Sequence, residues 1–217
     1  LALFAAYKEQ IDRYLGTELV LDLQQPMVLS GVFLGAMIPP IFSALLMLAV
    51  NKNAFRMIEE IRRQFREIPG ILKGTADPDY ATCVGLASEG ALKALVLPAL
   101  LAVVLPLAVG FVLGPAALGG FLGGAIFVGV HACESLGDYC ALFMSNAGGL
   151  WDNAKKYVEA GNCGGPGSDA HKAAVVGDTV GDPFKDTAGP SINTLITVMT
   201  LVSSLFAPII ARFHFFG

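Results

Sequence analysis

Charged residues are scarce in this chain of 217 residues, in which Asp, Glu, Lys and Arg make up 15% and hydrophobic residues 54%. The mean hydropathy is +0.63. This composition is too apolar for an ordinary soluble domain and is typical of an integral membrane protein. The formal net charge is -4 and like charges form no long run, so we predict that nucleic acid is not a partner.

Several common motifs are also missing. The four cysteines form no CxxC pair, and we interpret them as reduced thiols in helix packing. No GxxxxGK[ST] loop is present to bind phosphate. The sequence starts without Met and without the basic and apolar regions of a signal peptide. Residues 1–7 instead read as the end of a helix that begins upstream.

Four stretches are long and apolar enough to cross a bilayer, which takes about 20 residues. They are Pro26 to Val50, Leu92 to Leu113, Ala116 to Gly149, and about Asp178 to Ala211. The sequence therefore predicts an all-α, polytopic membrane helix bundle with four full transmembrane helices plus the end of a fifth. We expect a multi-pass protein in the lipid bilayer, in the cell membrane if the source is prokaryotic.

The segment from Asn51 to Gly90 separates the first two spans. Within residues 54–66, apolar side chains recur every three or four positions, which indicates an amphipathic helix. We interpret residues 51–90 as a cytoplasmic loop whose helix packs on the bundle. Residues 51–90 and 151–186, together with Lys93, hold eleven of the fourteen Lys and Arg residues. The positive-inside rule then places both regions in the cytoplasm.

Three aspartates, Asp178, Asp182 and Asp186, are spaced four residues apart. On an α-helix this spacing puts the three carboxylates on one face. Such a stripe at the end of a membrane helix favours binding of hard divalent cations, with Mg2+ as the leading candidate. Lys185 lies beside the stripe and could hold phosphate oxygens together with the metal.

A second set of charges follows the third predicted span. Asp152 lies three and four residues before Lys155 and Lys156, so a metal ligand and two ammonium groups share a helix face. Two helices would thus carry matching halves of a site in residues 151–186. The alternative is that these charges form a solvated, salt-bridged helix end.

Two other groups of residues fit a site less well. His171 stands alone after a glycine-rich loop, and we interpret it as a surface or capping residue rather than a base. His131, Cys133 and Cys140 lie in a polar insertion of the third span, but their spacing is unlike that of standard zinc ligands. A bulge or re-entrant turn explains this insertion better than a zinc site.

The stretch from Gly177 to Ser191, GDTVGDPFKDTAGPS, closely resembles the last-helix motif of membrane-bound ion-pumping inorganic pyrophosphatases. The stretch from Asn146 to Tyr157, NAGGLWDNAKKY, resembles the penultimate-helix motif of that family. Residues 62–70, RRQFREIPG, resemble its cytoplasmic-loop signature. The resemblance covers nearly the whole chain.

This resemblance implies a role for each charged residue. Asp182 and Asp186 would be catalytic by positioning the attacking water, and lysines would hold pyrophosphate. The implied Mg2+ ligands are Asp152, Asp178, Asp182 and Asp186, and the implied substrate-binding residues are Lys155, Lys156, Lys185 and Asn153.

The resemblance also implies what lies outside this sequence. Members of the family have sixteen spanning helices, and the chain matches the end of the twelfth through the sixteenth, so residues 1–217 would be the carboxy-terminal part of one pump domain. We expect the missing amino-terminal helices and a second copy, in a homodimer, as partners. Many members carry a lysine of the ion gate twelve residues after Lys185, where this chain has Thr197.

The leading functional hypothesis is pyrophosphate hydrolysis coupled to outward pumping of protons or sodium ions by the complete protein. A non-hydrolytic cation transporter or channel is the first alternative, because an acidic stripe could form a cation pathway. An inactive fragment is the second alternative, because most of the family's metal ligands lie on helices that this sequence lacks.

Overall fold

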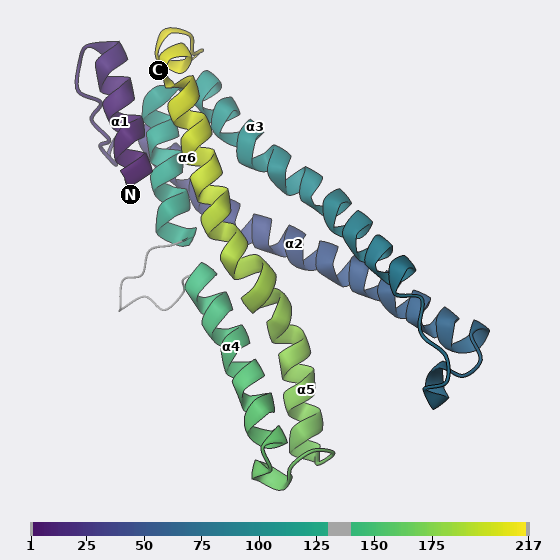
Figure 1. Cartoon of the computed structure of the whole chain (residues 1–217). Helices are drawn as coiled ribbons and strands as arrows, with labels where there is room; N and C mark the ends of the chain where they lie inside the picture. Colours follow the sequence, from purple (N-terminus) through teal and green to yellow (C-terminus); the bar gives the residue numbers. More distant parts are fainter. Residues whose placement is uncertain (1, 130–139, 216–217) are drawn as a thin grey trace.

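The computed structural model describes residues 2–129 and 140–215, and these residues form helices without a β-strand. Within residues 2–129 and within residues 140–215 the helices are joined by short connections (Figure 1). In chain order they are α1 (Ala2–Leu15), α2 (Pro26–Glu67), the 3-10 turn η1 (Ile71–Lys73), α3 (Tyr80–Gly129), α4 (Cys140–Glu159), the 3-10 turn η2 (Asn162–Gly164), α5 (Asp169–Asp182), the π-helix η3 (Pro183–Ala188) and α6 (Gly189–Arg212).

Helix α2 contains both the first predicted span and the amphipathic segment after it. Pro26 occupies the first turn, where its missing N–H costs no hydrogen bond. The helix continues through Pro39 and Pro40 to Glu67, without a break after Val50. The amphipathic segment is therefore an extension of the span, beyond the apolar part of the helix.

At the end of the α2–α3 hairpin, the side chain of Gln64 connects the two helices. Gln64 is 3% exposed. Its side-chain amide accepts a hydrogen bond of 2.8 Å from the Asp79 backbone N–H and donates one of 3.1 Å to the Asp79 carbonyl. The Asp79 side chain in turn accepts from the backbone N–H and hydroxyl of Thr82, in the first turn of α3. One buried amide thus joins the end of α2 to the start of α3.

Helix α3 is bent at Gly114, whose φ of 88° and ψ of 174° lie outside the helical region. Glycine adopts this conformation without steric cost, and Pro115 after it provides no backbone N–H to the helix. The Tyr7 hydroxyl, fully buried on α1, donates a hydrogen bond of 2.8 Å to the Pro115 carbonyl. The bend falls between the second and third predicted spans.

In the described part of the chain, three helical segments are long and apolar enough to cross a membrane, namely Pro26–Glu67, Tyr80–Gly129 and Asp169–Ile210. The prediction of an all-helical, membrane-spanning protein is confirmed. The count of four full spans plus the end of a fifth is not confirmed, because α3 holds the second predicted span together with residues 116–129 of the third, whose residues 140–149 belong to α4. The predicted third span also runs through residues 130–139, which lie outside the described residues.

Helices α2 and α3 touch along a seam of glycines. A Cβ atom on Gly31 or Gly35 of α2 would collide with the backbone of Ala117 or Phe121 of α3. A Cβ atom on Gly120 or Gly124 of α3 would collide with the α2 backbone. Small residues in this arrangement allow membrane helices to pack backbone against backbone.

We expect Gly120→Ala to destabilise the protein by about 1–3 kcal/mol, because the new methyl group would overlap the Val28 carbonyl. Gly123→Ala is the matched control, since a Cβ atom there meets nothing within 4 Å. Thermal unfolding of both variants in the same detergent measures the difference. Equal melting temperatures for the two would contradict the seam.

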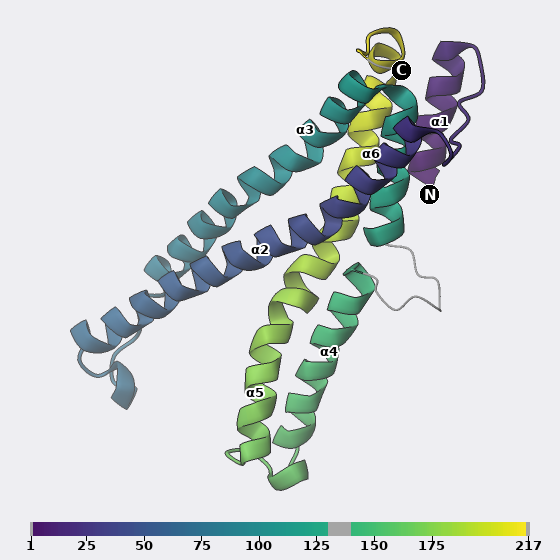
Figure 2. The ribbon, with the colours of Figure 1, turned by 180° about the vertical axis from the view of Figure 1, so that it is seen from behind.

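The hydrophobic core lies around α6, where α1, α2 and α3 meet it. Tyr7 and Ile11 of α1, Phe121 and Leu122 of α3, and Met199 of α6 are almost fully buried there. From this core the α2–α3 hairpin extends in one direction and the α4–α5 hairpin in another (Figures 1 and 2). The α4–α5 hairpin carries both predicted halves of the site.

Candidate functional site

The α4–α5 hairpin is closed by a capped loop. Ser168 precedes α5, and its hydroxyl accepts a hydrogen bond of 3.1 Å from the His171 backbone N–H, as a helix-capping serine does. The His171 ring accepts a hydrogen bond of 3.1 Å from the Gly167 N–H at Nδ1, and its Nε2 lies 3.3 Å from a Glu159 oxygen. These contacts agree with the interpretation of His171 as a capping residue.

Small residues bring α4 into direct contact with α5 and η3. A Cβ atom on Gly177 would overlap the ring of Trp151, and one on Gly181 would lie 3.0 Å from the Gly148 Cα atom. A Cβ atom on Gly148 would lie 2.7 Å from the Lys185 Cβ atom. The glycines thus allow the backbones of the two segments that carry the charges to lie in close contact.

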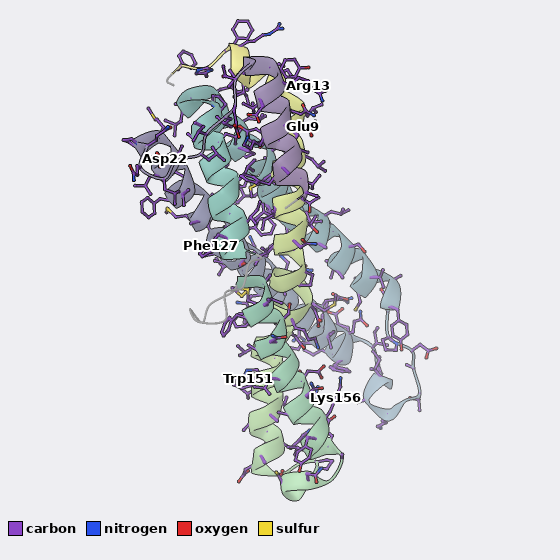
Figure 3. The ribbon with its side chains drawn as sticks, turned by 90° about the vertical axis from the view of Figure 1, so that its left-hand side faces the viewer. Glu9, Arg13, Asp22, Phe127, Trp151 and Lys156 are labelled. Carbon is purple, nitrogen blue, oxygen red and sulfur yellow. The ribbon has the colours of Figure 1, made fainter. Side chains whose placement is uncertain are left out.

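Each helix supplies a lysine to an aspartate of the other. Lys155 Nζ of α4 lies 2.7 Å from Asp178 Oδ2 of α5, and Lys185 Nζ of η3 lies 2.8 Å from Asp152 Oδ2 of α4. Lys156 adds a second ammonium group 2.9 Å from the same Asp152 oxygen. Figure 3 shows Trp151 and Lys156 on the part of the molecule remote from Glu9 and Arg13 of α1.

These ion pairs stabilise the charged forms of Asp152 and Lys155 on α4. Hydrogen bonds from Lys185 and then Lys156 lower the pKa of Asp152 to about 2. The hydrogen bond to Asp178 raises the pKa of Lys155. Because the Asp152 pKa is depressed, the stabilisation from its pairs is present above the unfolded-state pKa of about 3.9 and is lost as the pH falls toward 2. Asp152 is therefore ionised throughout the neutral range.

Asp178 is the most deeply placed carboxylate of the site, with 6% of its surface exposed. Its Oδ2 atom pairs with Lys155, whereas its Oδ1 atom is buried and has no hydrogen-bond partner in the structure. A buried carboxylate oxygen without a partner is costly, so a ligand that donates a hydrogen bond or positive charge there would stabilise the site.

The helix that carries the three aspartates changes its winding between Asp182 and Asp186. Residues 183–188 form a π-helix, in which the Gly189 N–H donates to the Phe184 carbonyl, five residues earlier. Pro183 opens this turn and removes a normal helical hydrogen bond. The regular α-helical stripe expected for the three aspartates therefore holds for Asp178 and Asp182 only, and Asp186 comes from a wider turn.

Asp182 and Asp186 are exposed next to the lysines. Asp182 acts electrostatically on both Lys155 and Lys185, and Asp186 Oδ2 lies 3.8 Å from Lys185 Nζ. Asn153 is exposed on α4. The four predicted aspartates thus lie near the lysines but differ in exposure: Asp178 is buried, Asp152 is half-buried, and Asp182 and Asp186 are exposed.

No group of three or more His, Cys, Asp or Glu side chains gathers as a metal site within residues 2–129 and 140–215. Mg2+ commonly uses only one or two protein carboxylates and fills its remaining positions with water and substrate phosphates. The free oxygen of Asp178 and the open carboxylates of Asp182 and Asp186 fit that donor set. His131 and Cys133, and the side chain of Cys140, for which a zinc site was considered and not favoured, lie outside the described residues.

A family model described as inorganic H+ pyrophosphatase matches residues 1–206. The chain belongs to this family. Over 210 residues it is 53% identical to the K(+)-insensitive pyrophosphate-energized proton pump of Methanosarcina mazei, covering 97% of this chain and 30% of that protein. It is 52% identical to a putative K(+)-stimulated pyrophosphate-energized sodium pump of Clostridium tetani, covering 98% of this chain and 30% of that protein.

The chain is thus about 30% of the length of these pyrophosphatase relatives. A third relative, the K(+)-insensitive pyrophosphate-energized proton pump of Caldanaerobacter subterraneus, is 50% identical over 94% of this chain and 28% of its own length. Relatives named for protons and for sodium ions are almost equally similar. Overall sequence identity therefore does not distinguish a proton pump from a sodium pump.

The predicted gate residue lies apart from the charged cluster. Thr197 belongs to α6, and its hydroxyl donates a hydrogen bond of 2.9 Å to the Asn193 carbonyl one turn earlier. Its side chain thus bonds to its own helix and contributes no charge. A role of Thr197 in an ion gate stays a prediction.

The residues that sequence reasoning missed are those that hold the two helices together. Trp151 packs on Gly177, and a Cβ atom on Gly189 would collide with the Ser145 hydroxyl. The available signal was the series of small residues at matching positions on the two motifs, which would have predicted a direct contact.

Proposed function

We propose that this chain works as part of a longer protein that hydrolyses pyrophosphate and couples the reaction to outward transport of protons or sodium ions. The observation that carries the proposal is the pair of crossed lysine–aspartate contacts between α4 and the α5–η3 segment. An anionic substrate needs ammonium groups that converge from more than one element, and this hairpin provides them. The names of the relatives support the same activity.

In this proposal Lys155, Lys156 and Lys185 bind the phosphate oxygens. Their positive charge would neutralise the charge that develops on the leaving phosphate, and they are already oriented by aspartates before substrate binds. Such preorganisation matters because reorienting charges during the reaction would raise the barrier. Asn153 would add a neutral hydrogen-bond donor at the rim.

The aspartates would hold Mg2+ and the attacking water. When bound, Mg2+ supplies a positive centre that polarises the phosphoryl oxygens. Asp182 and Asp186 are open enough to orient water and take up its proton, whereas the buried Asp178 would support the site through its free oxygen. Asp152 would contribute a carboxylate that stays ionised at neutral pH because of its lowered pKa. The distribution of Lys and Arg supports a cytoplasmic location for this cluster.

A transport assay on the complete protein tests this proposal. In sealed vesicles with the charged cluster outward, pyrophosphate with Mg2+ should cause phosphate release together with ion accumulation inside. The 217-residue chain alone should release no phosphate, because the cluster described here uses only two neighbouring helices. Ion flux down a gradient without pyrophosphate consumption would instead identify a channel.

A further inference from the structure

A cavity of about 300 Å³ lies between α2 and α3, remote from the charged cluster of α4 and α5. It lies beside the point where the Asn53 side chain packs against Gly90, at a contact too close for any Cβ atom there. The Asn53 amide also donates a hydrogen bond of 3.4 Å to the Ala87 carbonyl. The cavity is therefore bordered by a fixed contact between two helices.

The wall of this cavity has a cationic part and an apolar part. The cationic part consists of Lys52, Arg56 and Lys93, all exposed, and the apolar part includes Leu45 and Leu97. This division suits a ligand with an anionic head and an apolar tail.

The three cations are only partly neutralised. Lys93 pairs with Glu89, which also lies within electrostatic range of Arg56. Among residues 2–129 and 140–215, Lys52 and Arg56 form no ion pair. The cavity therefore retains positive charge for an anion.

The position along the helices matches the edge of a bilayer. Lys52 follows directly on the apolar stretch of α2 that ends near Val50, and Lys93 lies at the start of the apolar stretch of α3. The apolar wall extends from there toward the membrane interior, to Leu45 and Leu97. The cations are thus at headgroup level, and the apolar wall is at the level of acyl chains.

The opposite side of the same helix contact provides a natural comparison. A second cavity of about 320 Å³ shares Ala49, Asn53, Gly90 and Ala94 with the first. The remaining wall of the second cavity is made by Val50, Ala54, Met57 and Ala91, without a charged residue. The positive charge is therefore confined to one of two cavities of similar size.

We propose that the cationic cavity binds an anionic phospholipid, with the lipid phosphate between Lys52, Arg56 and Lys93 and an acyl chain along Leu45 and Leu97. Basic pockets between membrane helices are suited to such headgroups. A free phosphate would use the cations but not the apolar wall, and a neutral lipid would use the wall but not the cations. The combination selects the anionic lipid, and it is independent of pyrophosphate hydrolysis.

The test is lipid retention by the complete protein, measured by native mass spectrometry with added phosphatidylglycerol or phosphatidylcholine. The unmodified protein should bind one more phosphatidylglycerol than the Lys52→Gln/Arg56→Gln variant. The apparent affinity at this site should fall about fivefold for each cation removed. Lys73→Gln/Lys172→Gln removes the same charge from exposed positions elsewhere and should leave retention unchanged.

A second pair of variants separates a defined site from general attraction to charge. Leu97→Trp fills the apolar wall of the cationic cavity alone and should abolish the extra lipid, whereas Ala91→Trp fills the uncharged cavity and should not. Melting temperatures in phosphatidylcholine establish that each variant is folded. Equal retention by all four variants, or displacement of the lipid by millimolar inorganic phosphate, would overturn the proposal.

Discussion

Lys185→Ala should lower pyrophosphate hydrolysis by the complete protein by at least about 100-fold. The loss of one preorganised donor that faces developing negative charge typically costs this much. Lys185 is the only one of the three proposed phosphate-binding lysines that comes from the π-helix, and its ammonium is within 2.8 Å of Asp152 on the facing helix. Its removal would also leave Asp152 with Lys156 alone. Steady-state phosphate release at saturating Mg2+ measures the effect.

Lys172→Ala is the matched control for this variant. Lys172 lies on α5 and pairs with the exposed Asp169 at the remote end of the hairpin, so its loss removes the same charge without touching the cluster. Its activity should stay within about twofold of the unmodified protein, because exposed pairs of this kind contribute little. If Lys185→Ala kept its turnover but lost ion flux, the channel interpretation would replace the pump.

The second large effect should come from a single methyl group. In Gly148→Ala the added Cβ atom would collide with the Gly181 carbonyl and lie 2.9 Å from the Lys185 backbone nitrogen. Neither neighbour is the end of a flexible side chain, so the two helices must move apart. A displacement of about 1 Å in a catalytic site can cost about 100-fold in rate. We expect a loss of this size in phosphate release.

Gly149→Ala is the control, one position along the same helix. A Cβ atom on Gly149 meets nothing within 4 Å, and alanine favours helix more than glycine does. This variant should be as active as the unmodified protein and at least as stable. Comparable losses of activity in both variants would show that the helix itself, rather than its contact with Lys185, is sensitive to substitution.

The motifs in the sequence predicted which charged residues lie close together, because these residues are neighbours along the chain; their roles in a site stay a prediction. Asp152 with Lys155 and Lys156 lies within two turns of α4, and Asp178 with Asp182 lies within two turns of α5. Helical periodicity is therefore enough to show that they share a face. The crossed pairing of Lys155 with Asp178 was not predicted: the small residues indicate that the two helices touch, but the pairing also depends on how the helices are placed along each other, which the sequence does not show.

The count of spans depends on the segment around Gly114, and it is not confirmed. Hydropathy separates Leu113 from Ala116 because Gly114 and Pro115 interrupt the helix pattern. In the structure two helical segments of α3 meet at Gly114, and the second turns back beside α6 (Figure 1), with the Pro115 carbonyl hydrogen-bonded to Tyr7, 108 residues away in the sequence. Local patterns identify the weak point of a helix, whereas long-range packing decides whether the chain stops or bends at that point.

The amphipathic segment after the first span provides a similar case. Its periodicity correctly indicates a helix, but α2 continues from Pro26 to Glu67 as one element. The apolar and amphipathic parts merge because no glycine or proline separates Val50 from Ala54. The change from apolar to amphipathic composition within α2 thus marks the change from a membrane to an aqueous environment, and the helix itself continues.

Helices α5, η3 and α6 follow one another without an intervening loop from Asp169 to Arg212. The carboxylates that would meet substrate therefore lie on the same continuous helical segment as the buried side chains of Ile192 and Met199. Because no loop separates these segments, a rigid shift of the charged end would also move α6. The wider turn of η3 lies between the two parts, so a change in its winding would rotate α6 relative to the charged end.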